Sequence, residues 1–293
     1  MSHSTPAASI GTPRLAFPAL ILGNIVLAFG PVLVRLTDVG PTAAAFWRLA
    51  IALPFLLLLA RKELTQARLS AGEWGLMGLA GLFFAGDLAS WHLGILHTKV
   101  ANATVFGNIS ALLLPLWGIV VLRQTPGKWQ KIAIALAAVG TLVLMGGSYE
   151  TSPRYLKGDL LCLFAGFLYT FYFLLLQGAR RKLGSWSVLT VATVAATLPT
   201  LAFAMALGEK IMPTDWTWVI VLALSSQLVG QGLMVYAMGW FSPLILGLSL
   251  LLQPVVAALI GWILFGETVT PTDLMGAVAI AIALILVRLP VKA

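Results

Sequence analysis

Two charged side chains of this sequence lie inside apolar stretches, where a charge is costly. Arg48 lies within the apolar segment 41–60, and Asp87 lies within the segment 74–96. A guanidinium group can neutralise the carboxylate of a bound molecule, whereas a carboxylate can contact an amine or carry a proton. At 1.5 Å per residue, helices would place the two at roughly 10 and 14 Å from the same end of consecutive segments. We therefore expect Arg48 and Asp87 to pair or to share a polar network, either as a structural ion pair or as part of a substrate pathway.

Uncharged polar and aromatic side chains inside other apolar segments extend this set. An amide inside a membrane can also simply hydrogen-bond a neighbouring helix, and an aromatic ring can pack against lipid, so each candidate has a structural alternative. Gln227 and Gln231 have the spacing that puts two residues on one helix face. His92 lies near the end of its segment, where an interfacial role is the simpler interpretation, and only His92 and Asp87 are obvious proton carriers. The further candidates for a substrate cavity are Asn24, Trp47, Trp91, His92, Asn102, Asn108, Tyr172, Gln227, Gln231 and Gln253.

The composition indicates what class of protein these residues belong to. Of the 293 residues, 60% are hydrophobic and only 10% are charged, whereas soluble domains carry about 25% charged residues. This difference excludes a soluble enzyme and a disordered chain, and the single cysteine, Cys162, excludes a disulfide scaffold. The basic residues behind the net charge of +8 are scattered at the edges of apolar runs, which argues against a nucleic-acid partner. The sequence therefore predicts an all-α integral membrane protein.

Motifs for catalysis and for cofactors are missing from the sequence. It contains no phosphate-binding G-x-x-x-x-G-K-[ST], no H-E-x-x-H and no G-x-S-x-G. The three His residues are scattered, which makes a zinc site improbable. We expect no enzyme activity, no catalytic residue, no metal and no cofactor.

Apolar segments of about 20 residues, the length that spans a bilayer as a helix, divide the chain into ten predicted helices. When the N-terminus is placed in the cytoplasm, most of the 18 Lys and Arg residues fall at the inner ends of these segments. The positive-inside rule therefore predicts a multi-pass protein of the bacterial inner membrane with both termini in the cytoplasm. The predicted segments are 15–35, 41–60, 74–96, 100–122, 129–146, 158–179, 185–207, 216–238, 243–265 and 271–288.

The second half of the chain resembles the first. GNIVLAFGP from Gly23 is similar to GDLLCLFAG from Gly158, and AIALP, ending at Pro54, is similar to AATLP, ending at Pro199. Five helices per copy is an odd number, so the second copy must enter the membrane from the opposite side, which gives two inverted repeats. Pro115 and Pro254 interrupt helices of the two copies and are candidate hinges, with a static bend as the alternative. The predicted units are a cytoplasmic tail at 1–14, a first five-helix repeat at 15–146, a periplasmic loop at 147–157, a second five-helix repeat at 158–288 and a C-terminal tail at 289–293.

Two longer stretches resemble a known superfamily. DLASWHLGILHTKVANATVFGNISALLLPLW at 87–117 and LQPVVAALIGWILFGETVT at 252–270 are similar to the drug/metabolite transporter superfamily with its EamA-type repeats. Arg123-Gln124 departs from the pattern, because Gly266-Glu267 stands at the matching place of the second repeat. Within the superfamily the chain most resembles the bacterial exporters of aromatic amino acids of the YddG type.

The resemblance implies a secondary transporter that exports amino acids, aromatic ones included, or related small metabolites by alternating access. The expected partners are this small-molecule substrate and the lipid bilayer, with proton coupling left open and a monomer compatible with the sequence. Efflux of drugs or aromatic cations, with Asp87 as the key charge, is the alternative, and an intramembrane enzyme or a scramblase-like protein is a remote one.

Overall fold

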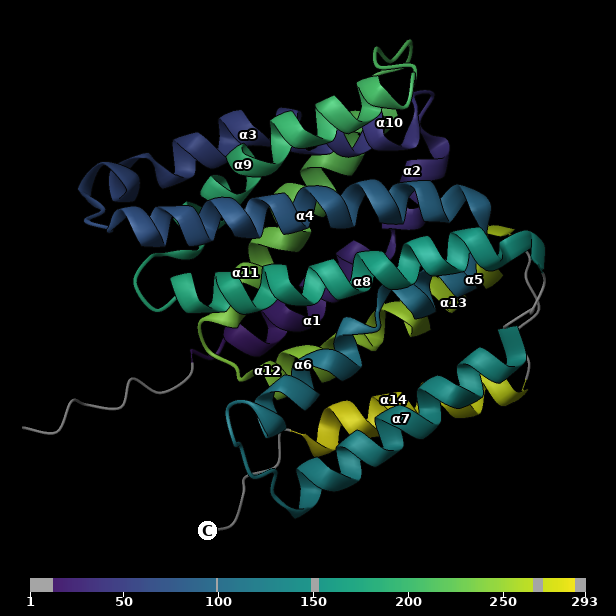
Figure 1. The fold of residues 1–293 in the computed structure, drawn as a ribbon. Helices are drawn as coiled ribbons and strands as arrows, with labels where there is room; N and C mark the ends of the chain where they lie inside the picture. Colours follow the sequence, from purple (N-terminus) through teal and green to yellow (C-terminus); the bar gives the residue numbers. More distant parts are fainter. Residues whose placement is uncertain (1–12, 99, 149–152, 266–270, 288–293) are drawn as a thin grey trace, which may run out of the picture.

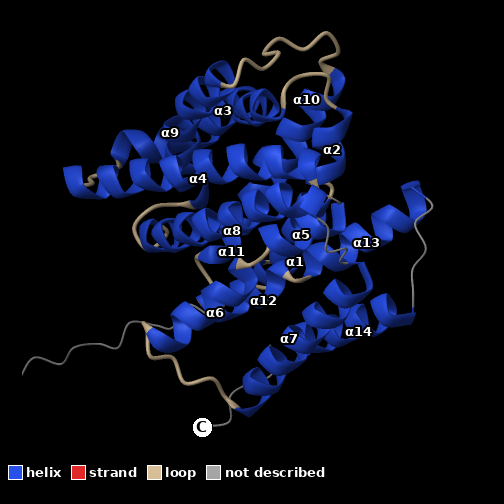
Figure 2. Cartoon of the chain, turned by 45° about the vertical axis from the view of Figure 1, so that its right-hand side comes forward, coloured by secondary structure: helices blue, strands red, loops and turns tan. Residues whose placement is uncertain are grey.

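The computed structural model describes residues 13–98, 100–148, 153–265 and 271–287, and all regular secondary structure within them is helical (Figure 2). Inside a bilayer every backbone N–H and C=O group must be bonded within the protein, and a helix achieves this within one segment. The predicted all-α class is thereby confirmed for the described part of the chain.

Within the described residues, six helices are long and apolar enough to cross a membrane, with mean hydropathies between 1.4 and 2.1 over their most apolar stretch. About 20 residues are needed to cross ~30 Å of hydrocarbon. The six are Ala16–Leu36, Pro41–Gln66, Ala71–His97, Tyr155–Ala179, Ser185–Ala206 and Thr217–Met238.

The described residues of the first half form seven helical elements, and several of these begin at local sequence signals. Pro41 occupies the first turn of its helix, where its missing N–H costs nothing. Ser70 and Glu73 form a capping box that starts the next helix. The elements are α1 (Ala16–Ala28), α2 (Gly30–Leu36), α3 (Pro41–Gln66), α4 (Ala71–His97), α5 (Val100–Gly107), α6 (Ser110–Val120) and α7 (Lys128–Ser148).

The second half forms eight further elements, including a π-helix. They are α8 (Pro153–Ala179), α9 (Ser185–Ala206), α10 (Thr217–Leu222), the π-helix η1 (Ala223–Gly230), α11 (Gln231–Met238), α12 (Pro243–Leu250), α13 (Leu252–Phe265) and α14 (Pro271–Leu286). The predicted loop at 147–157 is too long, because α7 continues to Ser148 and α8 already begins at Pro153. Proline fits the first turn of a helix, so Pro153 starts α8 where the polar residues after it had suggested a loop. The predicted tails at 1–14 and 289–293 lie almost entirely outside the described residues.

Several of the predicted segments are interrupted rather than straight. Segment 100–122 breaks at Asn108 and Ile109, ahead of Pro115, which lies inside α6. Segment 243–265 breaks at Leu251, just before Pro254. Proline leaves the carbonyl four residues earlier without its helical partner, which accounts for the break beside Pro254. Helix α6 continues through Pro115, and a hinge role for either proline stays a prediction.

The helices pack as antiparallel pairs, with α3 against α9 and α4 against α8 (Figure 1). Helices α7 and α14 lie side by side at the edge of the bundle in both views (Figures 1 and 2). The two helices approach closely at Gly140, where an added Cβ atom would lie 2.9 Å from the carbonyl oxygen of Gly276. Small residues at such contacts let membrane helices approach each other.

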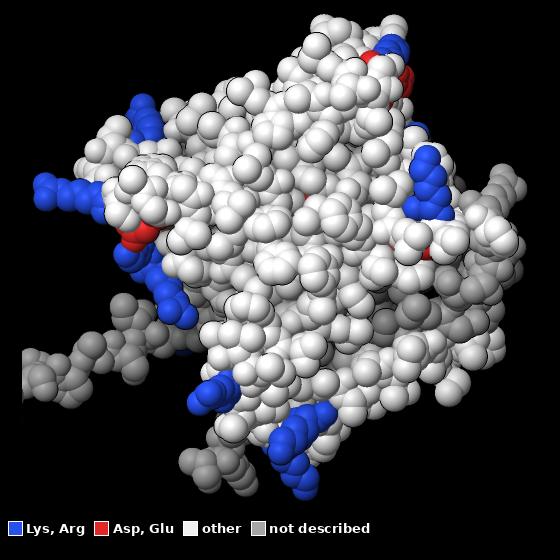
Figure 3. Space-filling model, viewed as in Figure 1, with Lys and Arg blue, Asp and Glu red and all other residues white. Residues whose placement is uncertain are grey.

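The charged side chains are confined to the ends of the molecule on the face that Figure 3 shows. Lys and Arg gather at the left and lower left, a smaller mixed group lies at the right, and the middle of this face is almost entirely uncharged. Large apolar side chains are exposed on the surface of the bundle, for example Leu198 of α9, which is 73% exposed. A wide uncharged band of this kind suits the hydrocarbon layer of a bilayer.

Candidate functional site

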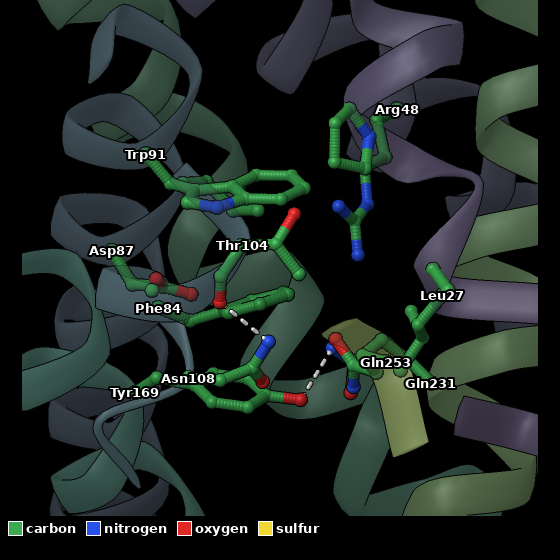
Figure 4. A pocket seen from close by; sticks show the side chains of 14 residues that line it. Leu27, Arg48, Phe84, Asp87, Trp91, Thr104, Asn108, Tyr169, Gln231 and Gln253 are labelled. Atoms are coloured by element: carbon green, nitrogen blue, oxygen red, sulfur yellow. Dashed lines mark hydrogen bonds between the residues drawn. The ribbon is translucent and has the colours of Figure 1, made fainter. Parts of the chain in front are cut away.

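A cavity of about 60 Å³ lies at the centre of the bundle (Figure 4). Helices from both halves of the chain supply its walls, so the cavity depends on how the two halves pack together. It is lined by Leu27, Ala28, Pro31, Arg48, Phe84, Asp87, Leu88, Trp91, Thr104, Gly107, Asn108, Tyr169, Gln231 and Gln253.

Arg48 enters this cavity from α3 and is only 3% exposed. Its Nε donates a hydrogen bond to Oε1 of Gln227 over 3.3 Å, and its Cζ lies 5.9 Å from the ring centre of Phe84. The terminal nitrogens of the guanidinium point into the cavity (Figure 4). With these nitrogens, an arginine can bind a carboxylate through two parallel hydrogen bonds.

Asp87 faces the same cavity from α4 (Figure 4). Within the described part of the chain it forms no hydrogen bond, and no ion pair of 4.0 Å or less joins it to Arg48. The expected direct ion pair is therefore absent, and the two charges instead share one cavity. This arrangement leaves both charges available to a third group that enters between them.

An aromatic wall stands next to Asp87. Phe84 and Trp91 flank it on the same face of α4, since residues three and four apart are neighbours on a helix. Tyr169 of α8 adds a third ring. Tyr172, the predicted wall residue, instead lies fully buried behind the cavity, stacked on Phe84 with ring centres 4.4 Å apart.

The amides at the cavity are held by hydrogen bonds. Nε2 of Gln231 donates to the Tyr169 hydroxyl over 3.1 Å, and Nε2 of Gln253 donates to Oδ1 of Asn24 over 2.9 Å. Nδ2 of Asn108 donates to the carbonyl oxygen of Thr104 over 2.8 Å. Gln231, Gln253 and Asn108 line the cavity, whereas Asn24 supports it from behind.

Trp47, His92 and Gln227 do not line the cavity. Nε1 of Trp47 donates to the carbonyl oxygen of Ile211 over 2.7 Å. Nδ1 of His92 lies 2.8 Å from the carbonyl oxygen of Pro41, and it must carry the hydrogen because a carbonyl only accepts. Gln227 stands behind Arg48 and shares no cavity surface with Gln231, despite their spacing. The side chain of Asn102 lies outside the described part of the chain.

Among the lining residues that the sequence candidates missed, Phe84, Thr104 and Tyr169 have aromatic or polar side chains. Phe84 and Asp87 are three residues apart on one helix face, which was a usable signal. For Tyr169 and Tyr172 no such signal exists, because both lie in mid-helix and only the packing of α8 against α4 decides which ring meets the cavity.

Two glutamates tie α3 and α9 together at opposite ends of the pair. Glu63, near the end of α3, accepts a hydrogen bond from the Ser187 hydroxyl at the start of α9 over 2.6 Å. Glu209, just after α9, accepts hydrogen bonds from the backbone N–H groups of Thr42 and Ala43 at the start of α3, over 3.2 and 2.8 Å. The first N–H groups of a helix lack helical partners and attract negative charge, so both carboxylates lie where they stabilise.

No group of three His, Cys, Asp or Glu side chains capable of holding a metal ion occurs in the described residues. The chemistry that the cavity offers is therefore that of one guanidinium, one carboxylate, three aromatic rings and several amides.

Comparison with known proteins shows the family of the chain. The sequence profile of the EamA-like transporter family matches residues 15–146 and 156–289, which is most of the chain. The chain belongs to the EamA-like transporter family.

Relatives of this EamA-like transporter are described as uncharacterized transporters. The uncharacterized transporter YdfC of Bacillus subtilis is 27% identical over 274 residues, which cover 89% of this chain and 86% of YdfC. An uncharacterized transporter of Archaeoglobus fulgidus is 26% identical over 178 residues, covering 60% of this chain and 61% of that relative. A crystal structure with 17% identity has a TM-score of 0.70 and covers 94% of this chain and 95% of that one. At this identity the crystal structure shows that the fold is shared.

Proposed function

We propose that this transporter exports amino acids, aromatic ones included, or related small metabolites across the bacterial inner membrane by alternating access. The observation that carries the proposal is that Arg48 and Asp87 face one buried cavity without pairing. An amino acid carries both of the opposite charges that these two residues would bind.

The pose follows from the chemistry of the walls. The substrate carboxylate accepts hydrogen bonds from the terminal nitrogens of Arg48, and its ammonium group donates to Asp87. A side chain would then lie against Phe84, Trp91 or Tyr169, where aromatic rings add stacking. A molecule with a carboxylate and an amine leaves neither buried charge without a partner, which matters because an unpaired buried charge is strongly destabilising.

Alternating access is supported by the size of the cavity and by the helix breaks. A water molecule needs about 10–15 Å³ of such space, so a cavity of about 60 Å³ holds a few waters but no amino acid. Entry of a substrate therefore requires the helices to move apart. The interruptions at Asn108–Ile109 and Leu251 are places where half-helices can tilt, because the N–H groups of Ile109 and Leu251 bond the carbonyl three residues back, and not four as in a regular helix.

The proposed topology is ten spans with both termini in the cytoplasm, arranged as inverted repeats at 15–146 and 158–288. It is supported by the antiparallel α3–α9 pair, in which Glu63 and Glu209 make equivalent contacts from opposite ends. A pseudo-two-fold axis in the membrane plane produces such reciprocal contacts.

Flux through liposomes that contain the purified protein tests the substrate class. We expect uptake of labelled aromatic amino acids that Arg48→Gln lowers about 10–100-fold, because hydrogen bonds to charged groups contribute ~1.5–3 kcal/mol. Arg48→Lys should recover only part of the rate, since an ammonium cannot bind a carboxylate through two parallel bonds. Absence of flux for every amino acid tried would refute the proposal.

Efflux of aromatic cations is a second candidate, because Asp87 stands beside three aromatic rings. The two candidates differ in which charge they need. If cations are the substrate, Asp87→Asn abolishes flux and Arg48→Gln does not lower it. If amino acids are the substrate, both variants lower it.

Proton coupling through Asp87 or His92 is tested in the same liposomes. With a pH gradient imposed, coupling predicts faster flux in the parent protein and an unchanged rate in Asp87→Asn. Equal rates with and without the gradient would exclude a coupled mechanism.

A further inference from the structure

A second cavity, of about 290 Å³, lies where α8 and α11 end and α12 begins, and it shares no lining residue with the central cavity. Its polar lining is rich in hydrogen-bond donors, namely two arginines, two glutamine amides and an indole N–H. No carboxylate of the described residues lines it, and Glu63, which interacts electrostatically with Arg180, already accepts hydrogen bonds from Gly184 and Ser187. A cavity with many donors and no acid attracts an anion.

Arg180 forms the fixed part of this cavity. Its Nε donates to the carbonyl oxygen of Val235 over 2.9 Å, and its Nη1 donates to the carbonyl oxygen of Leu183. Its Nη2 lies against Gly239, where any Cβ atom would collide with it. The guanidinium is therefore held in one orientation, while its neighbour Arg181 is exposed.

Trp240 contributes a donor that lacks an acceptor. Its Nε1 is buried and has no hydrogen-bond partner in the described part of the chain. A buried N–H without a partner costs ~1–3 kcal/mol, so an oxygen that reached it would be bound favourably. Ser242 begins α12 next to it, and its side chain makes no capping hydrogen bond.

We propose that this cavity binds the phosphate group of an anionic phospholipid, with Arg180 and Arg181 as its cations and the Trp240 N–H as a further donor. Arginine suits phosphate because its planar donors match two phosphate oxygens at once, which the exposed Arg181 can offer, whereas Arg180, engaged by Val235 and Leu183, contributes mainly its fixed positive charge. The site lies outside the central cavity and does not depend on which substrate is carried.

The adjoining surface explains why the phosphate belongs to a lipid rather than to a free ion. Helix α6, which ends at this cavity, exposes Leu112, Leu116 and Val120 at 40%, 55% and 63%. Spaced four apart, these side chains form one apolar stripe along the helix. An acyl chain lying on this stripe would place its headgroup at the arginines.

Thermal unfolding of the full chain in detergent tests the site. Mixed micelles that contain phosphatidylglycerol should raise the melting temperature on the order of 2–4 °C above micelles with phosphatidylcholine of the same acyl chains. Arg181→Gln and Trp240→Phe should each reduce this difference by half or more. The readout is the difference between the two lipids, so a general loss of stability in a variant does not affect it.

Two controls separate this site from surface charge and from free anions. Arg61→Gln removes an exposed arginine at the end of α3 and should leave the lipid difference unchanged. An equal loss in Arg61→Gln, or equal melting temperatures in the two lipids, would overturn the proposal. Inorganic phosphate alone should give no comparable shift, and a full shift with phosphate would overturn the assignment to a lipid.

Discussion

Gln227 orients Arg48 through a hydrogen bond, and Thr193 in turn orients Gln227. Gln227 accepts the hydrogen bond from Nε of Arg48, and its own Nε2 donates to the hydroxyl of Thr193 over 3.0 Å. With Nε engaged, the terminal nitrogens remain for the cavity. Gln227 is therefore a positioning residue, since it acts on a substrate only through Arg48.

Replacing Gln227 by Leu should weaken substrate binding. Loss of a hydrogen bond to a charged group, ~1.5–3 kcal/mol, corresponds to a KM raised roughly 10–100-fold with a smaller change in kcat. Liposome flux over a range of substrate concentrations measures both constants. Ser225→Ala on the same element is the control, because its hydroxyl bonds only the carbonyl oxygen of Val221. A fall in kcat at constant KM would contradict the positioning role.

Asp38 gives the stability of the protein a dependence on pH at one end of the molecule. It accepts hydrogen bonds from Nζ of Lys210 over 2.9 Å and from the backbone N–H of Thr214 over 2.8 Å. These bonds, with that from Lys210 the strongest influence, lower the pKa of Asp38 below its usual range. A carboxyl group whose pKa is lowered in the folded state stabilises the protein when the pH is above the pKa of that group in the unfolded chain, near 3.9. This stabilisation is lost as the pH falls towards the pKa of the folded state.

The expected outcome is a melting temperature that falls more steeply between about pH 5 and 3 for the parent than for Asp38→Asn. Thermal unfolding across this range, compared between the two proteins, measures it. Parallel curves for parent and variant would show that the contacts of Asp38 do not contribute to folding.

At the scale of the elements, the contact between α7 and α14 is set by the absence of a side chain. Gly140→Ala would place a Cβ atom 2.9 Å from the Gly276 oxygen and 3.0 Å from Cγ1 of Ile280. Overpacking of this kind costs ~1–3 kcal/mol. We expect Gly140→Ala to lower the melting temperature in detergent.

Gly78 provides the matched control for this substitution. It lies inside α4, and a Cβ atom there would meet nothing within 4 Å. Ala is favoured over Gly in a helix by ~0.5–1 kcal/mol, so Gly78→Ala should leave the melting temperature unchanged or raise it. Equal effects of the two substitutions would show that α7 and α14 do not pack as described.

For the whole molecule, Glu63 and Glu209 should act independently although they secure the same pair of helices. Each replacement by Gln should cost about 1 kcal/mol of stability, typical for a lost helix cap. A helix of 26 residues is ~39 Å long, and such distant sites are additive within ~0.3–0.5 kcal/mol. A double-mutant cycle of unfolding free energies measures this, and a coupling above 1 kcal/mol would contradict two separate caps.

Much of this architecture could be predicted from the sequence, because hydropathy reports lipid exposure directly. The segments 41–60 and 185–207 correspond to α3 and α9, and the two buried charges were identified by their surroundings. What could not be predicted depends on contacts between helices. The choice of Tyr169 over Tyr172, the support of Arg48 by Gln227 and the separation of Arg48 from Asp87 are all set by how the helices rotate against one another.

The α3–α9 pair has a mechanical consequence. Because Glu63 and Glu209 join the two helices at both ends, we expect α3 and α9 to move as one unit. Arg48 lies on α3, and Thr193 on α9 accepts a hydrogen bond from Gln227, which in turn bonds Arg48. Under the proposed alternating-access mechanism, a tilt of this pair would therefore move Arg48 together with the helices that open the cavity, so substrate binding and opening would be coupled.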